Sequence, residues 1–170
     1  MTDKQIEFVL GGGHLRNYQR MNYTPWGAAA EWIDNSLQSY LNSMKVLKKI
    51  NPDYVLEIDI AYAPKSKTLT VTDNAAGFSR DDLVYAFEMG EADKKRSKNL
   101  SEYNVGMKSS AMWLCLNWSI TTKHYDEDVE RKVIINNEDL YRNNFLLKES
   151  EKKVKGNSSY SILHFENLVQ

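Results

Sequence analysis

The stretch TLTVTDNAAGF, residues 68–78, decides the fold because it determines which way one carboxylate faces. Successive side chains of a β-strand point to opposite faces, so Leu69, Val71 and Asp73 share one face. If the apolar pair faces the core, Asp73 faces it too. A buried carboxylate is costly unless donors hydrogen-bond to it, and an adenine amino group is such a donor. A second interpretation is that the strand ends at Thr72 and that Asp73 caps a turn.

The composition limits the classes of protein that the chain can belong to. A chain of 170 residues with a net charge of -1 can bury one core, and near-neutral charge argues against a large nucleic-acid-binding face. We see no membrane-spanning stretch and no secretory pattern. The one cysteine, Cys115, fits a reducing cytoplasm, and its apolar surroundings predict a core residue. Three scattered histidines argue against a zinc site.

Hydrophobic periodicity predicts a two-layer α/β sandwich, one sheet covered by helices on one side. Thr24 and Pro25 begin a long amphipathic helix, which Asn51 and Pro52 end. The capping-box pattern of the second helix consists of Ser79 and Asp82. We predict strands near 55–62, 68–72, 118–123, 129–135 and 159–165, helices over 79–88 and 106–116, and a polar loop over 90–105.

Inside the long helix, Glu31 and Asn35 are four residues apart and therefore lie on one face, about one turn from each other. A carboxylate at this place could activate a water molecule, and the amide oxygen could ligate magnesium, which takes few protein oxygens. The alternative interpretation is a solvated polar stripe opposite Ile33 and Leu37, which any amphipathic helix has.

The segment EYNVGMKSSAMWL, residues 102–114, places glycine and hydroxyl side chains at a predicted helix start. Free backbone N–H groups in the first turn of a helix bind anions, so this segment is a candidate phosphate cradle. Four basic residues upstream could close over a polyphosphate, or could simply form a solvated loop: Lys94, Lys95, Arg96 and Lys98. Taken in chain order, the three segments supply a general base with a metal ligand, an acceptor for adenine and a cradle for phosphates. Together these are the parts of a nucleotide site.

These segments resemble the motifs of the GHKL ATPases, the family of the DNA gyrase B subunit, the ninety-kilodalton heat-shock protein, histidine kinases and MutL. The resemblance covers about residues 24–168 and implies the Bergerat-type fold, a mixed, mostly antiparallel sheet with helices on one face. EWIDNS is similar to the first motif, which implies that Glu31 is the catalytic base and that Asn35 holds Mg2+. DNAAGF is similar to the second motif, D-x-G-x-G, which implies that Asp73 binds adenine and that Gly77 passes beneath the base.

The other two motifs lie further along the chain. YNVGMKSS resembles the third motif and implies phosphate contacts for Gly106, Lys108 and Ser109, at the end of an ATP lid over about 90–105. The segment GNSSYSILHFENL, 156–168, is similar to the fourth motif, a strand with a hydroxyl beside adenine. We assign this hydroxyl to Ser161, with Ser159 as the alternative. Ala75 and Asn104 depart from the family pattern because they stand at glycine positions of the second and third motifs.

The resemblance implies Mg-dependent ATP binding and hydrolysis that drives a conformational change, usually dimerisation of N-terminal segments, and residues 1–23 are candidates for such a strap. One alternative is an ATP-binding module with negligible turnover in isolation, since relatives often take a catalytic lysine from a following domain. A histidine-kinase catalytic domain is the other. WGAAAEWIDNS and GMKSSAM are most similar to MORC-like members. We expect a cytoplasmic protein without membrane association, of which these residues are the N-terminal part. We also expect a further domain downstream or a DNA-related partner.

Overall fold

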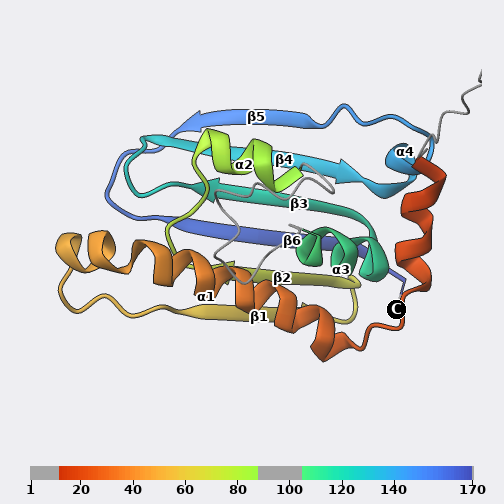
Figure 1. Cartoon of the computed structure of the whole chain (residues 1–170), viewed down its shortest axis with the longest axis horizontal. Coiled ribbons are helices and arrows are strands. Elements are labelled where there is room, and N and C mark those ends of the chain that lie inside the picture. The colour runs from red at the N-terminus through yellow and green to blue at the C-terminus, as the bar shows by residue number, and fades with distance from the viewer. Residues whose placement is uncertain (1–11, 88–104, 170) are drawn as a thin grey trace, which may run out of the picture.

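The computed structural model describes residues 12–87 and 105–169, and these form a six-stranded sheet with helices packed on one face (Figure 1). The strand order is β1-β2-β6-β3-β4-β5, and each neighbouring pair is antiparallel. The two-layer α/β sandwich is therefore confirmed, and its sheet is antiparallel throughout rather than mixed. The strands are β1 (Ile58–Ala63), β2 (Thr68–Asp73), β3 (Cys115–Lys123), β4 (Val129–Asn136), β5 (Lys148–Lys153) and β6 (Tyr160–Leu168). The helices are η1 (Gly12–Arg20), α1 (Pro25–Ile50), α2 (Arg80–Phe87), α3 (Gly106–Leu114) and α4 (Asn137–Tyr141).

Helix α1 begins and ends where its capping residues predict. The Thr24 hydroxyl accepts a hydrogen bond from the Gly27 N–H at 3.1 Å, and Pro25 occupies the first turn, where a missing N–H costs nothing. At the other end the Asn51 N–H donates to the Leu47 carbonyl at 2.9 Å. These caps confirm the predicted bounds of the helix.

The apolar stripe of α1 that carries Ile33 and Leu37 faces outward, although the apolar side of an amphipathic helix is expected to face the core. The helix contacts the sheet through Trp32, whose ring stacks on Phe165 with centroids 4.5 Å apart. The buried residues of α1 are Ala28, Trp32, Ser36 and Leu47. Trp26 is 76% exposed, and three large apolar residues further along the helix are 37% to 48% exposed: Ile33, Leu37 and Leu41. Periodicity identifies an amphipathic helix, but it cannot tell which side the rest of the chain covers.

The core lies between the sheet and the helices, around Trp118 of β3 and Phe165 of β6, whose rings stack at 6.4 Å. Cys115 is fully buried there, as predicted, and burial raises the pKa of its thiol to about 12. A thiol with so high a pKa is almost entirely protonated at neutral pH and is a poor nucleophile. Cys115 is therefore a packing residue.

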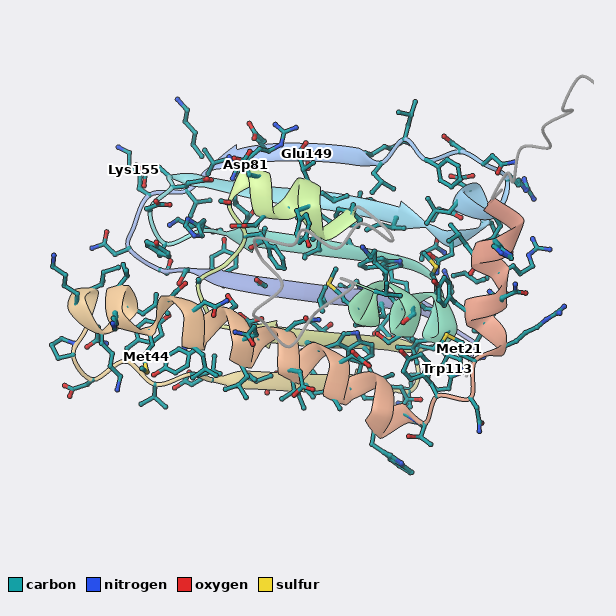
Figure 2. The ribbon with its side chains drawn as sticks, viewed as in Figure 1. Met21, Met44, Asp81, Trp113, Glu149 and Lys155 are labelled. Carbon is teal, nitrogen blue, oxygen red and sulfur yellow. The ribbon has the colours of Figure 1, made fainter. Side chains whose placement is uncertain are left out.

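Helix α2 starts with the predicted capping box. The Ser79 hydroxyl donates to Asp82 at 2.6 Å and accepts from the Asp82 N–H at 3.2 Å. An ion pair of 3.2 Å between Arg80 and Glu149 links α2 to β5, the two elements on which Figure 2 labels Asp81 and Glu149.

Strand β5, with the sequence KESEKK, was not predicted. All its residues are exposed, so its sequence has no apolar alternation. Charged residues on an edge strand hinder pairing with other chains.

The N-terminal segment and the predicted lid are described only in part. Helix η1 lies beside α3 and α4 at one end of the sheet (Figure 1). Residues 1–11 of the expected strap and residues 90–104 of the expected lid, with Asn104, lie outside the described residues. Among the described helices, none is long and apolar enough to cross a membrane.

Candidate functional site

Asp73 ends β2 and points to the helix-covered face of the sheet, as the alternation of TLTVTD predicts. It is 8% exposed, and the strand register places it between Ile58 of β1 and Ser161 of β6. One carboxylate oxygen also accepts a hydrogen bond from the Ala75 N–H at 2.9 Å, so Asp73 caps the following turn as well. The inward orientation of Asp73 is therefore confirmed, and the strand extends to Asp73 rather than ending at Thr72, although Asp73 does cap the turn.

The second carboxylate oxygen of Asp73 accepts a hydrogen bond from the Ser36 hydroxyl at 2.8 Å. Ser36 follows Asn35 in α1, so this bond joins the first and second motif segments. Sequence reasoning missed Ser36, because only the packing of α1 on β2 brings the two side chains together. A carboxylate has about four acceptor positions, so these two bonds leave room for a further donor.

Burial raises the pKa of the Asp73 carboxyl above its ordinary value of 3.8, and the bonds from Ser36 and Ala75 oppose this effect. The folded protein then holds the Asp73 proton more tightly than the unfolded chain does. The stability that this proton contributes is complete below pH 3.8 and is lost as the pH rises through the raised value.

We therefore expect Asp73→Asn, without nucleotide, to gain stability relative to the wild type as the pH rises from about 4 to 7.5, because the amide never ionises. Urea denaturation of both proteins at several pH values measures the difference. A difference that does not change with pH, or that reverses, would contradict the raised pKa.

Gly77 needs its missing side chain for two reasons. Its φ of 70° lies in the left-handed region, and a Cβ at this position would lie 2.1 Å from the Lys123 carbonyl oxygen. Ala75, by contrast, is absent from the positive-φ residues, and its methyl is buried at 1% exposure. Alanine at the first glycine position of this motif is thus free of left-handed strain.

Gly77→Ala is expected to lower the free energy of unfolding by about 3 kcal/mol, because it adds a left-handed alanine and a clash with backbone. Chemical denaturation measures this loss. Gly13→Ala is the control, since a Cβ on Gly13 would meet nothing within 4 Å. Equal stability of the two variants would show that the turn is not as tightly packed as described.

Glu31 lies against the N-terminus of α3. A Cβ on Gly106 would be 1.9 Å from Glu31 Oε2, so a larger residue at 106 would displace the Glu31 carboxylate from its present position. The first and third motif segments therefore meet at this point. Asn35 lies one turn further along the same flank of α1, half-buried, and its amide makes no hydrogen bond to another described residue. Both polar side chains are on the flank away from the exposed apolar stripe.

Two other residues of the third motif segment are buried in α3. Lys108 is 2% exposed. The Ser109 hydroxyl is 3.1 Å from the Gly106 carbonyl and 2.9 Å from the Tyr23 hydroxyl, and its N–H donates to the Val105 carbonyl. Ser109 already has protein partners, so its contact with a phosphate would require these bonds to rearrange. Val105, the N-cap, provides no side-chain acceptor for the first turn of α3.

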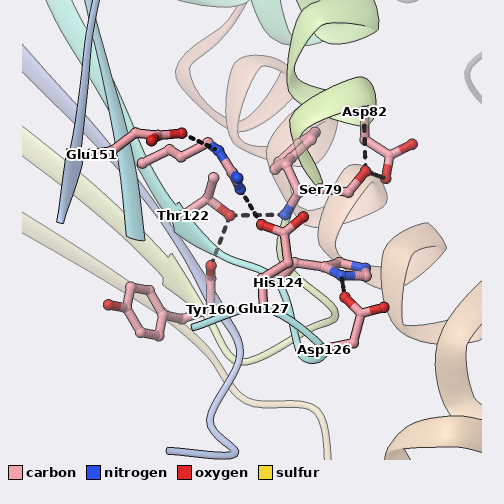
Figure 3. A network of polar contacts seen from close by, with 10 residues as sticks. Ser79, Asp82, Thr122, His124, Asp126, Glu127, Glu151 and Tyr160 are labelled. Atoms are coloured by element: carbon pink, nitrogen blue, oxygen red, sulfur yellow. Dashed lines mark hydrogen bonds and ion pairs between the residues drawn. The ribbon is translucent and has the colours of Figure 1, made fainter. Parts of the chain in front are cut away.

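Ser161 lies directly opposite Asp73 in the β2–β6 register and is 6% exposed. Ser159 is also buried, two residues earlier, with its hydroxyl 3.5 Å from that of Tyr54. On the other side of Ser161 is Thr122, a residue that sequence reasoning missed. The Thr122 hydroxyl donates to the Tyr160 carbonyl at 2.9 Å and accepts from the Phe78 N–H at 2.8 Å (Figure 3).

The turn after β3 brings together His124, Asp126 and Glu127, a group that the scattered histidines of the sequence did not suggest. Each of these side chains has a protein partner (Figure 3). His124 contacts Asp126, while Glu127 pairs with Arg131, which also bonds to Glu151 at 3.0 Å. These pairs account for the group without a metal ion.

Residues 23–163 match the model of the protein family described as histidine kinase-, DNA gyrase B-, and HSP90-like ATPase. The match covers most of the chain, which belongs to this GHKL-type family. No curated protein gives a match. The family implies ATP binding, and the match confirms the resemblance to the GHKL ATPases.

Proposed function

We propose that this domain binds Mg-ATP and hydrolyses it at the place where α1, α3 and the ends of β2 and β6 meet. The observation that supports the proposal most is that segments far apart in sequence converge there. Ser36 bonds to Asp73, Glu31 lies against Gly106, and Ser161 is the strand partner of Asp73. In this arrangement adenine would donate its amino group to Asp73, with Ser161 beside the base.

The phosphates would lie at the N-terminus of α3, where free N–H groups and the helix dipole favour anions. The Glu31 carboxylate is next to this helix end and would act as general base, accepting the proton of the water that attacks the γ-phosphate. We assign Gly106 and Lys108 to the phosphate side, and Ser109 if its bond to Tyr23 opens.

The residues present fit a magnesium ion. Asn35 offers a half-buried amide oxygen with no hydrogen bond to a described residue, and magnesium needs few protein oxygens when phosphates supply the rest. When bound, the ion would neutralise charge on the phosphate oxygens. We therefore assign Asn35 as the protein ligand.

Calorimetry with Mg-ATP and a phosphate-release assay test the proposal together. Binding with release of phosphate supports the ATPase. Binding without release favours an ATP-binding module that needs a further domain for turnover. Glu31 lies against Gly106, where it could activate a water molecule. This position favours ATP hydrolysis over transfer of the phosphoryl group to a histidine, the histidine-kinase alternative. No binding of Mg-ATP would contradict the proposal.

We also propose that ATP binding promotes self-association, with the exposed apolar flank of α1 covered by a second copy. The flank is defined by Trp26, Ile33, Leu37 and Leu41. It lies on the side of α1 away from Glu31 and Asn35, so contact there would not block the site. Because the motifs are most similar to MORC-like members, we propose a DNA-related partner as the first further partner to test.

Leu37→Glu is expected to keep nucleotide binding and to abolish the ATP-dependent dimer, because a charge replaces apolar contact area. Light scattering with a non-hydrolysable ATP analogue measures the mass of the particle. Lys49→Glu, at an exposed position near the C-terminal end of the same helix and off the apolar flank, is the control. A wild-type protein that stays monomeric with the analogue would argue against the dimer.

A further inference from the structure

Lys123, the last residue of β3, has a fully buried side chain that no sequence motif singles out. Its strand partners are Glu130 and Tyr160, so it lies on the sheet face opposite to Thr122 and the helices. The Lys123 Nζ donates to the Gly156 carbonyl at 2.9 Å and to the Ser158 carbonyl at 2.8 Å. Among the described residues it forms no ion pair.

A buried ammonium group is expensive compared with an apolar side chain of the same length, so packing alone does not explain a lysine here. What an apolar residue could not do is donate several hydrogen bonds from one atom. Lys123 donates two hydrogen bonds to carbonyls of a single connection, the one that leads from β5 into β6. Ser159 is the last residue of that connection, and Ser161 is the second residue of β6.

The backbone around Lys123 supports the other half of the adenine side. Gly77 packs on the Lys123 carbonyl, and the Tyr125 N–H donates to the Ala76 carbonyl at 3.1 Å. One residue before, the Thr122 hydroxyl accepts a hydrogen bond from the Phe78 N–H. The end of β3 thus contacts the segment that follows Asp73 through its backbone and the Thr122 hydroxyl, and the segment that precedes Ser161 through the lysine side chain.

We infer that Lys123 is a positioning residue for the adenine side of the site, whose ammonium group ties the Gly156–Ser158 connection to the end of β3 and so sets Ser161 opposite Asp73. The inference deepens the proposed function and rests on it. Lys123 does not touch the nucleotide. It acts on base binding and leaves the phosphate side, at α3, unchanged.

Calorimetry of adenosine, ADP and ATP with Lys123→Met tests the inference. The variant should weaken all three by the same factor, about tenfold, because losing bonds from a charged donor loosens only the side that binds the base. The ratio of ATP to ADP affinity should stay constant. Lys123→Arg keeps a cation with several donors and should bind within about threefold of the wild type. Lys132→Met, an exposed lysine on the same sheet face, should bind as the wild type does.

The outcomes separate this inference from the proposed function. If the wild type binds ADP and Lys123→Met binds it equally well with only a lower melting temperature, Lys123 is merely structural and the inference fails alone. If the wild type binds none of the three ligands, the proposed function fails and the inference fails with it. Should Lys123→Met not fold, Lys123→Gln replaces it, with affinity expected between those of the wild type and a tenfold loss.

Discussion

Glu31→Gln is expected to reduce ATP turnover at least 100-fold while leaving the dissociation constant for Mg-ATP within about threefold, because general-base catalysis contributes 10²–10⁴ in rate. The amide has nearly the shape of the carboxylate and fits the same space beside Gly106, but it cannot accept the proton of the attacking water. Phosphate release under saturating Mg-ATP measures the rate, and calorimetry measures the binding.

The matched control is Asp34→Asn, which removes a carboxylate from the exposed side of the same helix and should leave both quantities unchanged. A Glu31→Gln variant that hydrolyses ATP at the wild-type rate would remove Glu31 from the mechanism. Loss of binding together with turnover would point to a structural defect at α3, and would also contradict the role of Glu31 as a base.

Asp73→Asn is expected to weaken ATP and adenosine binding about 100-fold. The amide replaces one of the two buried acceptor oxygens with an NH2 group, a donor that would face the donor amino group of adenine. The Ser36 hydroxyl and the Ala75 N–H already occupy part of the carboxylate, so the amide cannot satisfy all the donors around it. Calorimetry with adenosine isolates this effect from the phosphates.

Two measurements distinguish lost recognition from lost folding. Without nucleotide, the variant should gain stability relative to the wild type as the pH rises from about 4 to 7.5, since burial raises the pKa of Asp73 and the ionised form carries a cost. Asp59→Asn, on exposed β1, should bind ATP normally. Undiminished adenosine binding by Asp73→Asn would mean that the base is recognised elsewhere.

The fold was largely predictable where local rules decide it. The alternation of TLTVTD gives the side on which Asp73 lies, because β2 is paired on both edges and only one of its faces is covered by helices. The caps of α1 and the Ser79–Asp82 box are local as well. The exposed strand β5 was missed because it lacks an apolar side.

The parts of the site that the sequence did not predict depend on tertiary contacts. Ser36 and Thr122 have no local pattern, and they matter only because α1 and β3 pack beside Asp73 and Ser161. The outward apolar flank of α1 has the same cause: the periodicity is correct, but the neighbours decide which side is covered. The φ angle of Ala75 could not be predicted for a related reason, since it depends on the turn that Gly77 and Lys123 make together.

The central claim is that the carboxylate of Asp73 selects adenine, and calorimetric titration of the wild-type domain with Mg-ATP and, separately, with Mg-GTP tests it most directly. Guanine presents a carbonyl oxygen where adenine presents its amino group, so it would face the buried carboxylate with an acceptor. We predict binding of ATP and at least 100-fold weaker binding of GTP. Equal affinity for the two nucleotides, or no affinity for ATP, would contradict the account.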